Sequence, residues 1–425
     1  MKVLLISTSD IEGGAARAAY RLHQGFQTVG INSQMLVQAK ASDDQAVFTS
    51  SSSFSKVVTK LKLTEHTDTL VLKRYSRSSK ALFSPQWVPD RVANAVTKLN
   101  PEIINLHWTC KGFLKVETVS KFRKPIVWTL HDMWAFTGGC HYTEDCDRYT
   151  KLCGSCPQLQ SDRDRDLSRW VLQRKARAWK DVNLTIVTPS SWLAKCARAS
   201  SLFQNTRVEV ISNGLDIRTY KPCDRTLARQ WLNLRQDKKL VLFGAALLED
   251  SRKGFALLEQ ALMRLGTTEH SDEIELVMFG SAKPSYRSLE QKFKVHYLGR
   301  FNDDVSLALV YAAVDVFVAP SLQDNLPNTV LEALSCGTPC VGFEIGGMPD
   351  LIEHQQNGYL AQPFDVDDLA QGIVWVLQNS ERHQKLCDRA RQKAEQDFTL
   401  ERQADQYTAL FKELLDVDRT KATIS

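Results

Sequence analysis

The sequence lacks the features that mark membrane-spanning, exported and nucleic-acid-binding proteins. No apolar run approaches the roughly 18 residues that a transmembrane helix needs. The opening MKVLLISTSD carries one lysine, a short apolar core and an acid, Asp10, which is typical of a buried strand rather than a secretion signal. The formal charge of +5 suits attraction to phosphates or to an anionic membrane surface, but it is too mild for a nucleic-acid partner. We therefore expect a cytoplasmic globular protein that binds no nucleic acid and lies, at most, peripherally on the inner face of the membrane.

Most of the cysteines also show no spacing that suggests disulfide pairs. Six of the ten are scattered along the chain: Cys110, Cys196, Cys223, Cys336, Cys340 and Cys387. In a reducing cytoplasm, disulfides are the least favoured interpretation. The other four lie in TGGCHYTEDCDRYTKLCGSCPQL, residues 137–159, and are Cys140, Cys146, Cys153 and Cys156. The last two form the CxxC pair that zinc favours, and four thiolates would order a loop with little apolar content. We expect a structural zinc ion here, with reduced thiols as the alternative; His141 would be a spare ligand or none.

Short apolar, β-branched runs alternate with helical patterns along the chain. KVLLIS, EIINLHW, PIVWTLHD, NLTIVTPS and VEVISNG precede about residue 213, and KLVLFGA, IELVMFG, VHYLGR, VDVFVAPS and TPCVGF follow about residue 239. This alternation predicts an α/β fold of two Rossmann-like domains with parallel sheets. We expect a first domain over 1–213, carrying the Cys-rich loop, and a second over 214–398. In such sheets, ligands bind beyond the carboxyl ends of the strands.

Two segments depart from the alternation. Residues 50–85 are rich in serine, lysine and arginine with intermittent Val, Leu and Phe. The plain interpretation is a solvated excursion with one helix; the alternative is a basic amphipathic surface for a membrane or an anionic acceptor. Over 399–418, the spacing of Ala404, Tyr407, Phe411 and Leu414 predicts an amphipathic helix that packs on another part of the protein.

Polar and glycine residues follow three strands of the first half. Gly13 and Gly14 permit a tight turn, and the helix that starts there carries partial positive charge at its amino end. A phosphate or sugar contact and a purely structural turn both stay open, because the three spaced glycines of a dinucleotide site are missing. Two other strands end in LHW and LHDMW, which places two histidines at one sheet edge. We favour a function for His131, beside Asp132, over one for His107.

The second half holds the strongest pattern, VFVAPSLQDNLPNTVLEALSCGTPCVGFEIGGMPDLI. A buried strand is followed by a polar loop and by a short helix that Asn328 can cap and Gly337 can end. Asp324 and Glu332, eight positions apart, can each accept hydrogen bonds from hydroxyl groups, and backbone amides near Thr329 can meet an anion. A sugar nucleotide, with phosphates between a ribose and a hexose, matches that arrangement.

This pattern resembles the donor-site motif of glycosyltransferase family 4, the retaining two-Rossmann-domain (GT-B) sugar-nucleotide transferases. In that motif an acid, seven residues and a second acid precede CGTP; here the first acid, usually glutamate, is Asp324, one methylene shorter. The stretches GGAARAAYRL, TLHD, PSSW, VISNGLD, RKGFALLEQAL and YLGRF resemble the family's further motifs. The family's usual phosphate-binding arginine is replaced by Arg252, next to Lys253. The chain thus resembles exopolysaccharide and colanic-acid-type transferases, in which the terminal helix crosses back to the first domain.

The resemblance implies transfer of a sugar, with retention, from a nucleotide-sugar donor to a glycan or lipid-linked saccharide. It implies that Glu332 holds the ribose, Asp324 a donor-sugar hydroxyl, and His131 the donor sugar or the charge that develops beside it. Phosphate and donor contacts are expected from Gly13, Gly14, Arg252, Lys253, Asn325, Leu326, Thr329 and Glu332, and acceptor-side contacts from His107, Trp108 and Asp132. No catalytic metal is expected, because fixed cations can stabilise the leaving phosphate. The alternative is a non-catalytic sugar- or nucleotide-binding protein on the same fold. A metal-dependent, single-domain transferase is disfavoured, since no acid-x-acid triplet ends a predicted strand.

Overall fold

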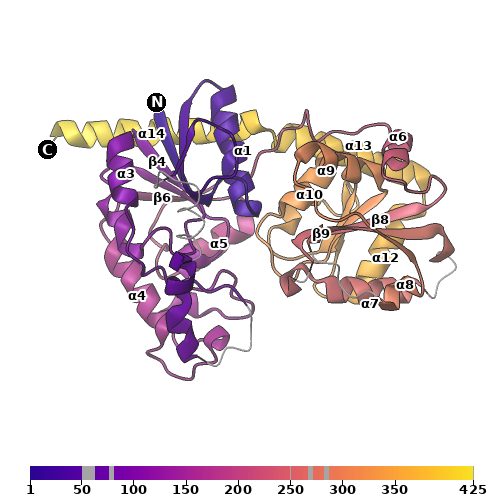
Figure 1. Cartoon of the computed structure of the whole chain (residues 1–425), viewed down its shortest axis with the longest axis horizontal. Coiled ribbons are helices and arrows are strands. Elements are labelled where there is room, and N and C mark those ends of the chain that lie inside the picture. Colours follow the sequence, from indigo (N-terminus) through magenta and orange to yellow (C-terminus); the bar gives the residue numbers. More distant parts are fainter. Residues whose placement is uncertain (50–62, 76–80, 249, 267–270, 282–286, 425) are drawn as a thin grey trace. The chain divides into compact units, whose positions relative to one another are not determined.

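The computed structural model describes residues 1–49, 63–75, 81–248, 250–266, 271–281 and 287–424 (Figure 1). The chain divides into two compact units. Unit 1 comprises Met1–Ser212 together with Leu400–Ser425, and unit 2 comprises Asn213–Thr399. Each is an α/β unit built on its own parallel sheet.

Unit 1 is built on a seven-stranded sheet in the part of the chain that the structure describes. Its order is β3-β2-β1-β4-β5-β6-β7, and every pairing of neighbouring strands is parallel. The strands are β1 (Lys2–Ser9), β2 (Asn32–Ala39), β3 (Val47–Thr49), β4 (Ile103–Leu106), β5 (Ile126–Thr129), β6 (Leu184–Thr188) and β7 (Val208–Val210). The helices are α1 (Gly14–Thr28), α3 (Val92–Leu99), α4 (Leu167–Trp179), α5 (Ser191–Ala199) and α14 (Leu400–Ile424).

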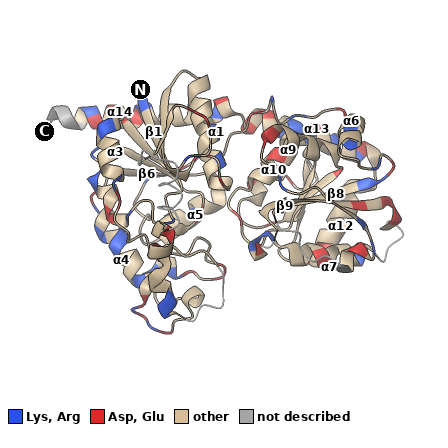
Figure 2. Cartoon of the chain, in the orientation of Figure 1, with Lys and Arg blue, Asp and Glu red and all other residues tan. Residues whose placement is uncertain are grey.

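Helices cover both faces of this sheet, so its strands are apolar on both sides. Along β1, Leu4 and Ile6 join one buried cluster while Val3 and Leu5 join another, as expected when successive side chains point to opposite faces. The central strands β4, β5 and β6 carry no Lys, Arg, Asp or Glu (Figure 2). The central strands therefore form a core that contains no charged side chain.

The terminal helix α14 belongs to this core. Tyr407 and Phe411 are fully buried beside Phe26 of α1, with ring centroids 6.2 and 5.6 Å from the ring of Phe26. The helices meet closely at Gly25, where a Cβ would lie 2.8 Å from the carbonyl oxygen of Leu400. The chain thus returns to unit 1 after completing unit 2.

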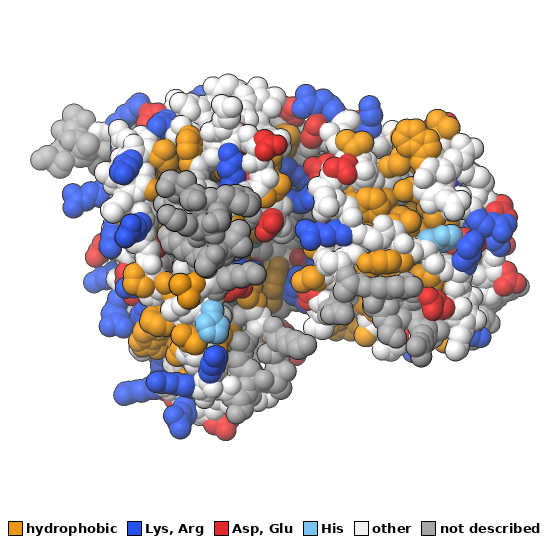
Figure 3. Space-filling model, in the orientation of Figure 1, with side chains coloured by type: hydrophobic (Ala, Val, Ile, Leu, Met, Phe, Trp, Pro, Cys, Tyr) orange, Lys and Arg blue, Asp and Glu red, His pale blue; other side chains and the backbone are white. Residues whose placement is uncertain are grey.

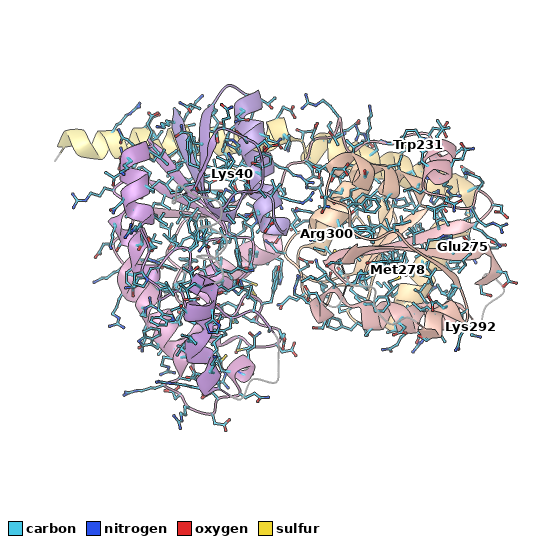
Figure 4. The ribbon with its side chains drawn as sticks, in the orientation of Figure 1. Lys40, Trp231, Glu275, Met278, Lys292 and Arg300 are labelled. Carbon is cyan, nitrogen blue, oxygen red and sulfur yellow. The ribbon has the colours of Figure 1, made fainter. Side chains whose placement is uncertain are left out.

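Unit 2 is built on a six-stranded parallel sheet of order β10-β9-β8-β11-β12-β13 within the described residues. The strands are β8 (Lys239–Leu247), β9 (Ile274–Ser281), β10 (Lys294–Tyr297), β11 (Val316–Ala319), β12 (Cys340–Phe343) and β13 (Gly358–Ala361). The helices are α6 (Arg225–Trp231), α7 (Phe255–Leu265), α8 (Arg287–Glu290), α9 (Asp304–Ala313), α10 (Asn328–Ser335), α11 (Met348–Leu351), α12 (Val366–Leu377) and α13 (Ser380–Asp397). Figure 4 contrasts Met278, inside the unit on β9, with Trp231, which is 80% exposed at the end of α6.

The ten apolar runs in the sequence all fall on strands, whereas β2, β3 and β13 were not predicted. One local expectation is wrong: Asn328 is the first residue of α10, and the N-cap is Pro327, whose fixed φ of −66° suits a helix start. Of the excursion at 50–85, residues 50–62 and 76–80 lie outside the described part, and 63–69 form a helix. No helix among the described residues is long and apolar enough to cross a membrane.

Candidate functional site

Both sheets reverse their strand order at an equivalent point. In unit 1 the reversal lies between β1 and β4, and in unit 2 between β8 and β11. Parallel sheets bind ligands beyond the carboxyl ends of the strands at such a switch point. Gly13 follows β1 and His107 follows β4, while Lys253 follows β8 and Asp324 follows β11. The sequence-predicted residues therefore form one candidate site in each unit.

In unit 2, the loops after β8 and β11 are locked together through their backbones. Gly254 has a φ of +74°, and a Cβ there would lie 1.7 Å from the carbonyl oxygen of Pro320. The N–H of Leu322 donates to the carbonyl of Arg252 over 2.8 Å. Only glycine permits this approach at position 254, so the two cations that precede it are held beside the β11 loop.

The two cations of this site share one buried carboxylate. Lys253 Nζ lies 2.6 Å, and Arg252 Nη1 3.3 Å, from Asp324 Oδ2. Arg252 Nη1 also donates to the carbonyl of Gln323 over 3.0 Å. Asp324 is only 6% exposed; burial raises the pKa of this carboxyl, but the positive charges of Lys253 and Arg252 outweigh burial and lower the pKa to about 2. Arg252 and Lys253 are therefore a fixed source of positive charge at the switch point.

The loop after β12 fixes the backbone of the same acid. Gly347 N–H donates to the carbonyl of Asp324 over 3.1 Å, and a Cβ on Gly346 would lie 2.1 Å from that carbonyl oxygen. Gly346 also has a φ of +53°. These glycines were not assigned a role from the sequence, although the GG of EIGGMPD was the available signal.

Glu332 lies on α10 and is 3% exposed. The hydroxyl of Tyr311, on α9, donates to Glu332 Oε2 over 3.1 Å. The Tyr311 ring is fully buried and packs edge-on against Phe279 and Phe317. This tyrosine was not predicted from the sequence, because a Tyr in an apolar helix is indistinguishable from an ordinary core residue.

The other predicted residues of the unit 2 site surround these two acids. Asn325 and Leu326 are buried, and the N–H of Asn325 donates to Asp324 Oδ1 over 3.0 Å. Thr329 is half-buried in the first turn of α10. The structure thus brings all the predicted donor-side residues of unit 2 to one sheet edge.

In unit 1, Gly13 and Gly14 form the turn between β1 and α1. Gly13 has a φ of +94°, a value that L-residues rarely adopt, and Gly14 is the first helical residue. The preceding acid, Asp10, is fully buried and accepts hydrogen bonds from the backbone N–H groups of Ile11, Ala41 and Ser42 at 2.8–3.1 Å. Asp10 therefore fixes the entry to the glycine turn against the loop after β2.

His131 and His107 lie at neighbouring strand ends with stacked rings. Their ring centroids are 5.3 Å apart, and His107 Nδ1 lies 3.0 Å from His131 Nε2. His107 is 2% exposed and its other nitrogen lies 3.0 Å from Asn105 Oδ1. The ring of His107 is buried and both of its nitrogens are engaged by protein groups, and its expected acceptor-side contact stays a prediction. Burial lowers the pKa of half-buried His131 to about 4, against the opposing charge of Asp132.

Asp132 is the centre of a second network. Its carboxylate accepts from Trp108 Nε1 at 2.8 Å and from the backbone N–H of Trp134 at 2.9 Å, and it pairs with His141 Nδ1 at 2.6 Å. Burial raises the pKa of Asp132, but His141 and the hydrogen bonds outweigh it and lower the pKa. His141 is therefore engaged by Asp132, and an acceptor-side role for Trp108 and Asp132 stays a prediction.

The four clustered cysteines are free thiols, as are the other six. Burial raises the pKa of Cys140 and Cys153, and the neighbouring thiols raise it further. Lys175 is fully buried nearby and donates to the carbonyls of Trp134 and Thr137. In the described part of the chain, no three His, Cys, Asp or Glu side chains are placed to hold a metal ion. The zinc expectation thus stays a prediction.

Comparisons with known proteins agree with this arrangement. The model for Glycosyltransferase Family 4 matches residues 12–219, and the model for glycosyl transferases group 1 matches residues 238–379. The chain is a family 4 glycosyltransferase. The enzyme is 25% identical to the putative colanic acid biosynthesis glycosyl transferase WcaC of Escherichia coli over 83% of the chain and 85% of the relative. It is 26% identical to the N-acetyl-alpha-D-glucosaminyl L-malate synthase of Bacillus anthracis over 51% of the chain, a match that spans 56% of that relative.

Solved structures show that the enzyme has the GT-B fold. Sucrose-phosphate synthase from Thermosynechococcus elongatus superposes with a TM-score of 0.70 at 18% identity, covering 98% of this chain and 99% of that one. Anabaena HepE, in complex with UDP and glucose, superposes with a TM-score of 0.66 at 18% identity, covering 97% and 99%. The fold expected from the sequence, two Rossmann-like domains of a GT-B glycosyltransferase, is therefore confirmed.

Proposed function

We propose that the enzyme transfers a sugar, with retention, from a nucleoside diphosphate-sugar to a hydroxyl of a glycan or lipid-linked saccharide in cell-surface or exopolysaccharide biosynthesis. The observation that carries the proposal is the pair Arg252 and Lys253, held at the switch point of unit 2 by the buried Asp324. A diphosphate would take the place of that carboxylate as the partner of the two cations. Glu332, eight positions after Asp324 and on α10, would accept the ribose hydroxyls.

The chemistry of the reaction matches these charges. As the bond between the sugar C1 and the diphosphate oxygen breaks, negative charge gathers on the leaving diphosphate and positive charge on the sugar. Preorganised cations stabilise such a developing anion most strongly where water is excluded. Arg252 and Lys253 would supply that charge. The acceptor hydroxyl would form the new bond from the side of the leaving group, and its proton would pass to the departing phosphate.

Unit 1 would supply the remaining contacts of the reaction. The turn at Gly13 and Gly14 offers backbone amides at the start of the fifteen-residue helix α1, a position that suits phosphate or sugar oxygens. His131 would meet the donor sugar. Among the relatives, WcaC is named for colanic acid biosynthesis and HepE was solved with UDP-glucose, which supports a nucleotide-sugar donor and a polysaccharide product.

Donor hydrolysis and transfer test the proposal directly. Purified enzyme is incubated with UDP-, GDP- and ADP-sugars, and release of the nucleoside diphosphate is measured with and without saccharide acceptors. We expect turnover with one donor class, and a loss of roughly a hundredfold or more in kcat/KM for Lys253→Ala, because the leaving diphosphate loses a fixed cation. Lys292→Ala is the matched control: Lys292 is exposed and precedes β10, at the opposite edge of the same sheet (Figure 4).

The main alternative is a non-catalytic protein that binds a sugar or nucleotide with the same residues. It predicts that Lys253→Ala weakens nucleotide binding while the wild-type protein neither hydrolyses nor transfers any donor. Binding measured by calorimetric titration beside the turnover assay separates the two functions. Tight nucleotide binding without turnover across the donor and acceptor panel would favour the alternative.

A lipid-linked acceptor would bring the enzyme to a membrane surface. Lys and Arg side chains are spread along the α3–α4 side of unit 1 (Figure 3). Trp170 of α4 is 43% exposed, with the Arg174 guanidinium 4.4 Å from its ring centroid. Basic and aromatic side chains together suit the interface of an anionic bilayer. Sedimentation with anionic but not with neutral vesicles, lost at high salt, would support peripheral association; equal recovery in the supernatant with both would contradict it.

A further inference from the structure

Five side chains of unit 1 form one continuous line of hydrogen bonds that reaches His131. Tyr407 OH lies 2.8 Å from Thr129 Oγ1, to which Asn105 Nδ2 donates over 3.0 Å. Asn105 Oδ1 lies 3.0 Å from His107 Nε2, and His107 Nδ1 lies 3.0 Å from His131 Nε2. All but His131 are buried. The line connects the terminal helix to the predicted reaction centre.

The carbonyl of Val127 fixes the direction of the hydrogen bonds. A carbonyl only accepts, and it lies 3.0 Å from Asn105 Nδ2, so this atom is the amide nitrogen and Oδ1 faces His107. Oδ1 also only accepts, so His107 carries its hydrogen on Nε2. Burial, with the neighbouring His131, lowers the pKa of His107 well below its usual value, which keeps the ring neutral. Its Nδ1 therefore holds a lone pair and accepts from His131 Nε2.

The same reasoning sets the hydrogen on His131. The ring donates through Nε2, and with its pKa lowered to about 4 it carries a single hydrogen at neutral pH. Nδ1 then holds a lone pair. Any group that meets His131 through Nδ1 has to donate a hydrogen bond to it.

We propose that Asn105 and His107 are positioning residues that fix the tautomer of His131, so that His131 binds a substrate hydroxyl by accepting its hydrogen at Nδ1. The substrate part of this inference rests on the proposed function; the tautomer part does not. The assignment excludes an imidazolium that pairs with the diphosphate and a histidine that donates to it. The ligand group at His131 is a hydroxyl of the sugar or of the acceptor.

Nitrogen NMR of the full-length enzyme tests the tautomer without any assay of activity. In protein labelled with ¹⁵N-histidine, long-range proton–nitrogen correlations distinguish a ring nitrogen that bears hydrogen from one that holds a lone pair. The signals are assigned by comparison with His107→Gln and His131→Gln. We expect hydrogen on Nε2 and a lone pair on Nδ1 in both rings at pH 7. Hydrogen on Nδ1 of His131 overturns the proposal.

Asn105→Asp is expected to raise the pKa of His107. The introduced carboxylate still accepts from His107 Nε2, but its charge raises the pKa of His107. Below that raised pKa, His107 is protonated at both nitrogens and donates to His131, which moves the hydrogen of His131 to Nδ1. We expect kcat to fall roughly tenfold to a hundredfold on the acid side, where a buried acceptor has been lost, and to recover on the alkaline side. Asp132, beside His131, and Tyr407, through Thr129, are the other titratable groups that face this line.

Tyr407→Phe is the matched control. It removes the far end of the line but leaves the bond from Asn105 to the Val127 carbonyl, which sets the direction. We expect the wild-type tautomers and a wild-type pH profile, with any loss confined to stability. A pH profile of Asn105→Asp that parallels the wild type contradicts the proposal. The expected tautomers in a protein without transferase activity would instead retain the tautomer assignment and reject the proposed function.

Discussion

The ion pairs of Asp324 give the sharpest test of the unit 2 site. In the folded enzyme the pKa of this carboxyl is lowered from 3.8 to about 2, because Lys253 and Arg252 outweigh the effect of burial. At 1.36 kcal/mol for each pKa unit, the shift corresponds to about 2 kcal/mol of stability. Asp324→Asn keeps the shape of the side chain and removes its charge. We therefore expect the variant to lose about 2 kcal/mol of unfolding free energy at pH 7.

The pH dependence of that loss separates the ion pair from a packing effect. Because the folded pKa is depressed, the stabilisation is complete above pH 3.8 and disappears as the pH falls through the folded value near 2. The difference between the wild type and Asp324→Asn should be constant from pH 7 to pH 5 and should fall to roughly half by pH 3. This difference in unfolding free energy is measured at each pH by urea unfolding, followed by circular dichroism, in the transition in which unit 2 unfolds.

Asp250→Asn is the control for this prediction. Asp250 Oδ2 lies 3.2 Å from Arg252 Nη2 and is 33% exposed, so it pairs with the same guanidinium in a more solvated setting. An exposed pair of this kind contributes up to about 1 kcal/mol. An equal loss for both variants, or a loss for Asp324→Asn that does not change between pH 7 and pH 3, would refute the reasoning.

Three further predictions concern the nucleotide, the core and the cysteines. Tyr311→Phe should weaken nucleoside diphosphate binding about tenfold in calorimetric titration, because the hydrogen bond that holds Glu332 is lost; an unchanged Kd would refute it. Phe411→Ala should lower the unfolding free energy of unit 1 by about 3–5 kcal/mol in urea unfolding, because it empties a buried site. Lys412→Ala, at the exposed neighbouring position, should leave it unchanged. Freshly purified enzyme should contain about one zinc ion per chain, lost in Cys153→Ser; metal-free wild-type protein would contradict this.

The fold was predictable because parallel strands leave a strong pattern in the sequence. Runs such as KVLLIS are apolar on both faces, so β1 and its central neighbours could be located without any partner information. Strand β2 begins with Asn32 and Ser33, and β13 has only four residues, GYLA. Neither stretch is distinct from a loop or helix edge by composition, so the missed strands are the partly polar β2 and the edge strands β3 and β13.

The positions of the site residues were predictable, and their partners were not. The sequence placed Lys253 and Asp324 after strands of one sheet, which is enough to expect them at the same edge. Their separation of 71 residues along the chain gave no indication that the acid pairs with the lysine before any ligand arrives. For His141 the sequence left open whether it is a spare zinc ligand or none, and the fold turns it toward Asp132. Side-chain direction within a loop depends on contacts that no local pattern contains.

The buried residues that hydrogen-bond the site residues could not be predicted from the sequence, for a further reason. Asn105 and Tyr311 lie inside apolar segments, where a single polar residue is equally consistent with a minor irregularity of the core. Both are nearly or fully buried, and each gives its polar atoms to a residue at the candidate site. A buried polar group that lacked a partner would cost about 1–3 kcal/mol. A lone Asn or Tyr in the middle of a predicted core element therefore indicates that the side chain has a buried hydrogen-bond partner. In unit 1 the partner of Asn105 is His107, which contacts His131, and in unit 2 the partner of Tyr311 is Glu332.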